Sequence, residues 1–308
     1  MGVLMALLVA GAIYAMFFRE NLIISKAEAK ERYSTPSSHF INWRGAEIHY
    51  TDEGQGTPVM MIHGFGGNFT NFDSLAAIMK TDHRVVRVDL PGFGLSDLPE
   101  PHDSLSEMYG SFLSHMLDTL QLDSLYVVGN SMGGWMGWEL AVAQPGKVKG
   151  LVLIGSAGYE IEKVKANIGR IDMLDNAFFR KLTERGVPLW MSEKTAQRMR
   201  SKWETFIPEE VLVNNGIANR QGNFNNLITL GNSGVMPDTA KIMQVACPTL
   251  IIAGKQDVIV PWEHTEKFKR DIANSKVLVY DTCGHIPQME YPHRVERDTE
   301  AFFSVGAL

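Results

Sequence analysis

Short apolar runs alternate with helical stretches along most of this chain, and that alternation constrains its fold more than any other feature. Continuous apolar runs are typical of strands that are buried on both faces of a sheet. Their alternation with helices predicts an α/β fold with a mostly parallel sheet. The predicted strands are Phe40–Trp43, Ala46–Tyr50, Val59–Ile62, Val85–Val88, Leu125–Val128, Leu151–Ile154, Thr249–Ala253 and Val277–Tyr280, and the clearest helices are Ser104–Leu120 and Trp135–Ala143.

One long stretch interrupts the alternation. Residues 158–239 contain no convincing buried strand and instead show amphipathic helical pieces. We interpret them as a helical cap inserted into a single core, which residues 40–157 and 240–308 form together. The helical pieces are Ile168–Arg185, Glu193–Trp203 and Glu209–Asn219.

The N-terminus carries an apolar run, Gly2–Phe18, without a charged residue. As a helix it would extend roughly 26 Å, which nearly matches the hydrocarbon core of a bilayer. This predicts a membrane-anchor helix over residues 1–20, followed over residues 21–39 by a linker or by a short surface helix with a loop. More basic residues follow the run than precede it, so the positive-inside rule places the body of the protein on the cytoplasmic side.

Two other interpretations of this run stay open. A cleaved signal, which would make the protein an exported one, should have basic residues before its apolar stretch, and none are present. Ala27-Glu28-Ala29 could mimic a cleavage site but lies well beyond the run. The third interpretation is a helix buried in the core.

Composition excludes several classes of function. The net charge of −6 leaves no basic surplus to neutralise phosphates, which argues against nucleic acid as a partner. Cys247 and Cys283 are too few for a disulfide framework or a cysteine metal site. Nothing in the composition fixes the oligomeric state.

Gly129-Asn130-Ser131-Met132-Gly133 follows one predicted strand and precedes a helix. The pattern Gly-x-Ser-x-Gly in this setting is typical of a nucleophile elbow, in which a tight turn holds the serine hydroxyl above the sheet. The hydroxyl then lies at a helix N-terminus, where the dipole favours a developing anion. We therefore predict that Ser131 is a nucleophile; the alternative is a plain glycine-rich turn with a solvent-facing serine.

A serine nucleophile needs a base, and the base needs an orienting carboxylate. Asp257 follows the predicted strand Thr249–Ala253, and His285 follows Val277–Tyr280 after a turn at Gly284. Parallel strands present such groups at one edge of the sheet, so we predict Asp257 as the acid and His285 as the base. Three rivals, His264, His293 and Asp281, are expected at the surface. A fourth, Asp89, is expected to close a turn through its side chain.

An oxyanion hole is the third requirement of this chemistry. His63-Gly64-Phe65-Gly66-Gly67 follows the strand Val59–Ile62, and its glycines allow backbone N–H groups to approach a ligand closely. We expect the amides of Phe65 and Met132 to be the donors. His63 is expected to brace this loop rather than to act as a second base.

Four motifs in this order resemble the α/β-hydrolase superfamily over about residues 40–304. The resemblance implies an eight-stranded sheet with a cap inserted after strand six, a serine mechanism, and no cofactor or metal. The motifs are His63-Gly64, Asp89-Leu90-Pro91-Gly92-Phe93-Gly94-Leu95-Ser96, Gly129-Asn130-Ser131-Met132-Gly133-Gly134 and Cys283-Gly284-His285.

Within the superfamily the chain resembles membrane-anchored monoacylglycerol lipases. The features are the apolar N-terminus, Gly254-Lys255-Gln256-Asp257, and the Met289-Glu290 and Pro292 that follow His285. The resemblance implies hydrolysis of a carboxylic ester, with a small ester or lipid as substrate and membrane contact through the N-terminal helix. The cap residues expected to line an acyl pocket, or else to pack the cap onto the core, are Phe178, Phe179, Leu189, Trp190, Trp203 and Phe206.

Two other functions stay open. Hydrolases that cut carbon–carbon bonds in ring-cleavage products share a motif similar to Asn130–Gly134, although they usually carry a Gly-Pro-Gly oxyanion loop where this chain has Phe65-Gly66-Gly67. A ligand-binding receptor with the same fold is the third reading, and an intact Ser131, Asp257 and His285 argues against it. Related enzymes that attack with aspartate are excluded by Ser131.

Overall fold

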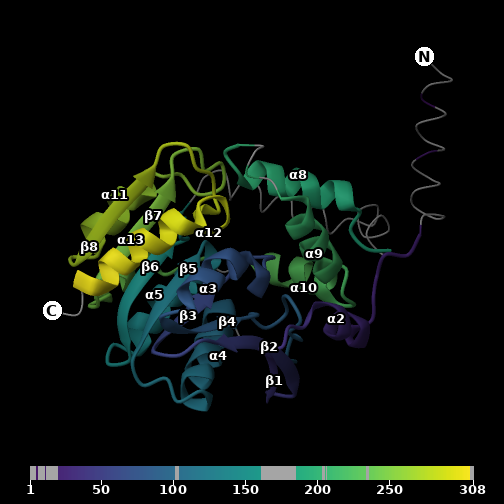
Figure 1. Cartoon of the computed structure of the whole chain (residues 1–308), viewed down its shortest axis with the longest axis horizontal. Helices are drawn as coiled ribbons and strands as arrows, with labels where there is room; N and C mark the ends of the chain where they lie inside the picture. The colour runs from purple at the N-terminus through teal and green to yellow at the C-terminus, as the bar shows by residue number, and fades with distance from the viewer. Residues whose placement is uncertain are drawn as a thin grey trace.

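A single sheet of eight strands forms the centre of the molecule, in the order β1-β2-β4-β3-β5-β6-β7-β8. The computed structural model describes residues 5, 11, 20–100, 104–160, 185–202, 205, 207–233 and 236–305. β2 is antiparallel to β1 and β4, and the other neighbouring pairs are parallel, as predicted (Figure 1). The strands are β1 (Ser38–Trp43), β2 (Ala46–Glu53), β3 (Thr57–Ile62), β4 (His83–Val88), β5 (Leu125–Asn130), β6 (Val148–Ile154), β7 (Thr249–Gly254) and β8 (Ser275–Tyr280).

Helices cover both faces of this sheet, because successive residues of each strand point to opposite faces. In β3, Met60 and Ile62 pack into the hydrophobic cluster of one face, while Val59 and Met61 pack into that of the other. Both faces are therefore buried, which explains the continuous apolar runs. The first face carries α4 (Leu105–Thr119), α5 (Met132–Ala143) and α11 (His264–Asp271), and the second carries α3 (Asp73–Met79) and α13 (Pro292–Val305).

Between β6 and β7 the described chain forms three helices, which we call the cap (Figure 1). They are α8 (Leu189–Met199), α9 (Pro208–Ala218) and α10 (Asn223–Gly231), and the 3₁₀ helix η3 (Thr239–Gln244) leads from them into β7. The helix predicted at Glu193–Trp203 begins earlier, directly after Pro188, and ends earlier, because Arg200 is extended. The helix predicted at 168–185 lies outside the described residues, apart from Arg185, and α10 had not been predicted.

The predicted linker over residues 21–39 is packed onto the cap. The Leu22 N–H donates to the Arg185 carbonyl at 2.8 Å, and Ile24 forms a parallel bridge with Arg220. The helix α2 (Lys26–Tyr33) then contacts α9 at Gly216, where an added Cβ would lie 1.8 Å from the Tyr33 hydroxyl. This segment therefore straps one side of the cap to the body before β1 begins.

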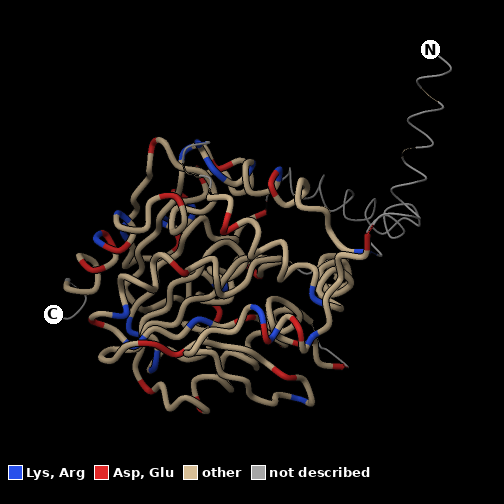
Figure 2. Tube along the Cα trace, turned by 45° about the vertical axis from the view of Figure 1, so that its right-hand side comes forward, with Lys and Arg blue, Asp and Glu red and all other residues tan. Residues whose placement is uncertain are grey.

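The predicted anchor over residues 1–20 lies outside the described residues, apart from positions 5, 11 and 20. In the part of the chain that is described, no helix is both long and apolar enough to cross a membrane. Acidic and basic residues are interspersed along the trace of the same part (Figure 2).

Candidate active site

Ser131 occupies a tight turn between β5 and α5. Its φ of 55° lies in the left-handed region, which non-glycine residues rarely adopt. An added Cβ on Gly129 would lie 2.3 Å from the Gly133 carbonyl oxygen, and one on Gly133 would lie 2.0 Å from that of Ile62. The two glycines are therefore required by backbone atoms on both sides of the turn. This is the geometry of a nucleophile elbow.

The oxyanion-hole candidates lie beside this turn. Gly64 brings the loop after β3 so close that a Cβ there would be 3.1 Å from the Ser131 Cβ. Phe65 comes next in this loop, and Met132 is the first residue of α5. Neither amide has a hydrogen-bond acceptor among the described residues. Both N–H groups are thus available to a ligand near Ser131.

His285 and Asp257 are hydrogen bonded. The Asp257 Oδ2 accepts from the His285 Nδ1 at 2.7 Å, and both side chains are almost completely buried. The other oxygen, Oδ1, accepts from the backbone N–H groups of Ile259 and Val260 at 2.7 and 2.9 Å. The carboxylate is therefore fixed, and it holds the imidazole so that Nε2 is left for the nucleophile.

Ser131 and His285 line the same cavity. Within the described residues, the Ser131 hydroxyl and the His285 imidazole do not form a hydrogen bond with each other. Asn130, the residue before the serine, connects the two loops: its Nδ2 donates to the carbonyls of Ile154 at 3.0 Å and His285 at 3.1 Å. The sequence analysis assigned Asn130 no role, because the motif leaves its position open.

The rival acid and bases lie elsewhere. Asp281 is exposed and pairs with Lys255 at 3.4 Å, and His293 is also exposed. His264 is buried and packs edge-on against Tyr159, with ring centroids 5.8 Å apart. None of the three rivals is among the residues lining the cavity.

Asp89 closes the loop after β4 from within. Its Oδ1 accepts from the Phe69 N–H at 2.7 Å, and its Oδ2 accepts from the Leu95 N–H at 2.8 Å and from His49 Nδ1 at 2.7 Å. Burial alone would raise the pKa of Asp89, but the hydrogen bond from His49, the two neighbouring histidines and the Leu95 N–H together hold the pKa below its usual value. Asp89 thus has the turn-closing role expected of it.

His63 braces the oxyanion loop. Its Nδ1 donates to the Gly64 carbonyl at 2.7 Å, and its Nε2 accepts from the Leu90 N–H at 3.1 Å. Both ring nitrogens are therefore engaged by backbone, and complete burial lowers the pKa of His63. A neutral histidine with no free nitrogen is a structural residue and not a second base.

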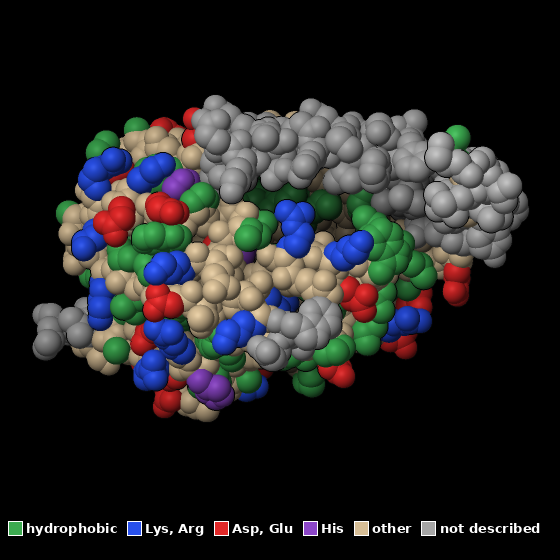
Figure 3. All heavy atoms as spheres, turned by 90° about the horizontal axis from the view of Figure 1, so that it is seen from above, with side chains coloured by type: hydrophobic (Ala, Val, Ile, Leu, Met, Phe, Trp, Pro, Cys, Tyr) green, Lys and Arg blue, Asp and Glu red, His purple; other side chains and the backbone are tan. Residues whose placement is uncertain are grey.

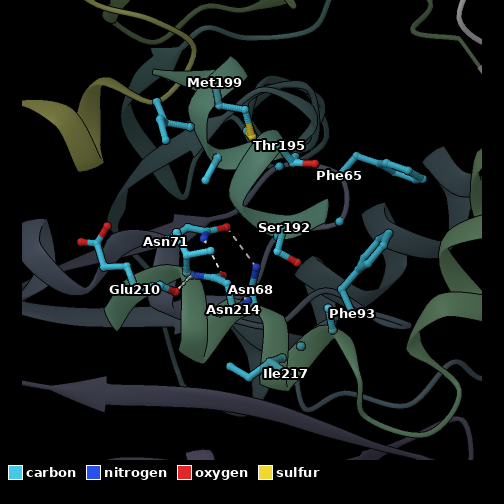
Figure 4. A pocket seen from close by; sticks show the side chains of 18 of the residues that line it. Phe65, Asn68, Asn71, Phe93, Ser192, Thr195, Met199, Glu210, Asn214 and Ile217 are labelled. Carbon is cyan, nitrogen blue, oxygen red and sulfur yellow. Dashed lines mark hydrogen bonds between the residues drawn. The ribbon is translucent and has the colours of Figure 1, made fainter. Parts of the chain in front are cut away.

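The cavity beside Ser131 has a volume of about 420 Å³. From above, hydrophobic side chains are visible deep in a hollow of the surface (Figure 3). In close view, Phe65 and Phe93 lie on one side, with ring centroids 5.3 Å apart, and an amide cluster lies opposite them (Figure 4). In this cluster the Asn214 Oδ1 accepts from Asn68 at 2.7 Å and from Asn71 at 3.1 Å. The cavity therefore has an aromatic wall and a polar wall.

An ion pair between buried Arg200 and half-buried Glu210 continues the polar wall. The Arg200 guanidinium donates to the Glu210 carboxylate at 2.8 Å, and the Arg200 side chain is only 3% exposed. Burial raises the pKa of Glu210, although the charge of Arg200 opposes this shift. Arg200 and Glu210 are the only Asp, Glu, Lys or Arg side chains among the described lining residues.

The predicted acyl-pocket residues need correction. Leu189 and Trp190 begin α8 but do not line the cavity, and the Trp190 side chain is 53% exposed. The face of α8 toward the cavity instead carries Met191, Thr195 and Met199, which recur at the helical spacing of four. The remaining predicted positions, Phe178, Phe179, Trp203 and Phe206, lie outside the described residues.

In the described ranges, no group of three or more His, Cys, Asp or Glu side chains could hold a metal ion.

Several known proteins and one family model are similar to this chain. A family model described as "alpha/beta hydrolase fold" matches residues 57–292. The chain is 29% identical to "Lipase 1" of Psychrobacter immobilis over 85% of this chain and 82% of the lipase. It is 28% identical to "2-hydroxy-6-oxononadienedioate/2-hydroxy-6-oxononatrienedioate hydrolase 2" of Pseudomonas putida, over 85% of this chain and 94% of that protein.

A solved structure titled as a membrane phospholipase A, a novel bacterial virulence factor, superposes with a TM-score of 0.75 at 21% identity. The match covers 99% of this chain and 97% of the phospholipase chain. At this identity the likeness shows the fold alone.

Proposed function

The chain belongs to the α/β-hydrolase family, and from this premise we propose that it hydrolyses carboxylic esters through an acyl-enzyme. His285 takes the proton of Ser131 as the hydroxyl attacks the ester carbonyl, while Asp257 holds the imidazole in place. The amides of Phe65 and Met132 stabilise the oxyanion. His285 then protonates the leaving alcohol and activates the water that releases the acid. The observation that carries this proposal is the buried His285–Asp257 hydrogen bond at the rim of the cavity that Ser131 lines.

The two walls of the cavity suggest how an ester would lie. The alcohol must leave on the side of His285, because that side chain gives it a proton. The His285 N–H donates to the Met199 carbonyl at 2.7 Å, and the next residue, Arg200, brings its ion pair with Glu210 to this side. The aromatic wall of Phe65 and Phe93 would take the apolar acid. A medium-chain ester of a polar alcohol, such as a monoacylglycerol, fits this division.

The charge of the cavity favours an ester over a ring-cleavage product. Relatives of both kinds match this chain at similar identity, so identity does not separate the two activities. The names of the carbon–carbon hydrolases describe substrates that are carboxylic acids, whose charge needs a cation. The described lining offers Arg200 for this purpose, but Glu210 already neutralises it. A neutral ester requires no such charge.

We also propose that the apolar run Gly2–Phe18 anchors the protein in a membrane, with the enzyme body on the cytoplasmic side. A lipid-derived substrate would then be concentrated beside the enzyme. Cell fractionation tests this: the full chain should sediment with membranes, and a chain lacking residues 1–20 should not. Equal partition of both chains would refute the anchor, and protease accessibility in spheroplasts would decide the side.

A substrate series tests the ester assignment. We expect turnover of p-nitrophenyl and glycerol esters, with a preference for medium acyl chains over acetate, and no turnover in Ser131→Ala. A ring-cleavage dienoate should be a far poorer substrate. A higher kcat/KM for the dienoate would overturn the ester assignment and keep the triad, whereas binding without turnover of either class would indicate a receptor.

A further inference from the structure

Glu290 joins the loop of the catalytic histidine to the cap. It lies in the short helix α12 (Pro287–Glu290) and is 7% exposed. One carboxylate oxygen, Oε1, accepts from the Gly284 N–H at 2.6 Å. The other, Oε2, accepts from both the N–H and the hydroxyl of Ser201, at 2.9 and 2.7 Å. Donors thus approach both oxygens, and a carboxylate can accept from both at once.

Direct backbone contact reinforces this connection. The His285 N–H donates to the carbonyl of Met199, the last residue of α8, at 2.7 Å. A Cβ on Gly284 would lie 2.3 Å from this carbonyl oxygen and 2.9 Å from Glu290 Oε1. The absence of a side chain at Gly284 therefore lets the end of α8 rest on the histidine loop.

The same helix forms part of the cavity. Thr195 and Met199 of α8 line it, and both are visible in Figure 4 on the side of the cap. A ligand that fills the cavity therefore touches α8 less than three turns from the contacts with Glu290 and His285. Glu290 itself does not line the cavity, so it cannot touch the ligand directly.

We propose that Glu290 is a positioning residue that makes the placement of His285 depend on the cap. This inference rests on the proposed ester hydrolysis. A substrate that contacts α8 presses the end of the helix onto the histidine loop, and the carboxylate transmits this constraint to Gly284 and His285. A substrate too small to reach α8 gains nothing from the connection.

Two variants test the connection from opposite sides. Glu290→Gln keeps the shape of the side chain, but its amide can accept from only one of the two sides. Ser201→Ala removes the hydroxyl that lies 2.7 Å from Glu290 Oε2 and 2.8 Å from the Thr282 carbonyl oxygen of the histidine loop, and it keeps the N–H that donates to Glu290. Glu296→Gln, which makes the same change of charge on α13, is the matched control. Each protein is assayed with p-nitrophenyl acetate and p-nitrophenyl octanoate, after a thermal melt confirms that it is folded.

We expect Glu290→Gln to lower kcat for the octanoate about tenfold, which corresponds to the loss of one charged hydrogen bond, with a much smaller loss for the acetate. Ser201→Ala should show the same selectivity more weakly. The double variant should be no worse than Glu290→Gln, because the two residues act through one connection. Glu296→Gln should match the wild type.

Equal losses with the two esters, or additive losses in the double variant, would overturn the proposal and leave Glu290 as a purely structural residue. If Glu290→Gln does not fold, the selectivity of Ser201→Ala decides by itself. The wild-type protein is assayed before the variants. If it hydrolyses neither ester, this outcome refutes the proposed function itself.

Discussion

The carboxyl edge of the sheet and the cap are held in place by different means. At the edge, backbone packs on backbone: a Cβ on Gly129 or Gly133 would lie within 2.3 Å of a carbonyl oxygen of the core. In the cap, side chains make the decisive bonds. Asn219 holds both the N–H and the carbonyl of Val187, at 2.6 and 3.1 Å.

This difference explains what each region contributes. Backbone contact at the edge tolerates almost no change, and it fixes the turn of Ser131 before a substrate arrives. Side-chain bonds can be exchanged for others of similar strength, so a cap can change its lining without disturbing the chemistry. We therefore expect mutations at the edge to remove catalysis and mutations in the cap to redirect it.

The largest effect is expected for Ser131→Ala. Loss of the nucleophile should reduce kcat by about 10⁴-fold or more. Stability should change little, because alanine keeps the Cβ of the serine and loses only the hydroxyl. Steady-state kinetics with p-nitrophenyl butyrate and a thermal melt check both parts. Activity within tenfold of the wild type would show that another group attacks the ester.

Gly133→Ala should break the edge itself. The added Cβ would lie 2.0 Å from the Ile62 oxygen and 2.6 Å from the His63 oxygen. Overpacking against backbone should cost about 3 kcal/mol of unfolding free energy or prevent folding. Gly146→Ala is the control, because nothing lies within 4 Å of its Cβ, and it should stay within about 0.5 kcal/mol in urea titrations. Equal stability of the two variants would contradict the backbone argument.

In the cap, Asn219→Ala should have a milder and more selective effect. The lost bonds to Val187 should cost about 1–3 kcal/mol of stability. Val187 lines the cavity, so the KM for octanoate esters should rise while the kcat for acetate stays near that of the wild type. Chain-length profiles of both proteins measure this. An equal loss of kcat/KM at every chain length would contradict the proposed difference between the edge and the cap.

The smallest effect concerns pH. Burial lowers the pKa of His63 from 6.5, so the unfolded chain binds more protons than the folded one as the pH falls through this value. The contribution of His63 to the free energy of unfolding should therefore be constant above pH 6.5, and it should decrease as the pH falls below this value. His264, whose pKa burial also lowers, should add to the decline. Urea titrations between pH 8 and pH 5 measure the slope, and a stability that rises on acidification would contradict the burial of neutral histidines.

The same difference decides what the sequence could predict. Gly-x-Ser-x-Gly and the glycine before His285 are visible because backbone contact demands them. The roles of Asn130 and Glu290 were missed, because the partners of both residues are distant in sequence. Asn130 donates to the His285 carbonyl, and Glu290 accepts from the Ser201 N–H of the cap. Trp190 was expected to line an acyl pocket or to pack the cap onto the core, but the register of α8 turns it to solvent. Such a register depends on the neighbouring helix α9, which no local pattern specifies.

Labelling with a fluorophosphonate, followed by peptide mass spectrometry, tests the central claim most directly. We expect one adduct, on the peptide that contains Ser131. It should form quickly in the wild type and at least about a hundredfold more slowly in His285→Ala. An adduct on a different residue, or equal labelling rates in the two proteins, would contradict this claim.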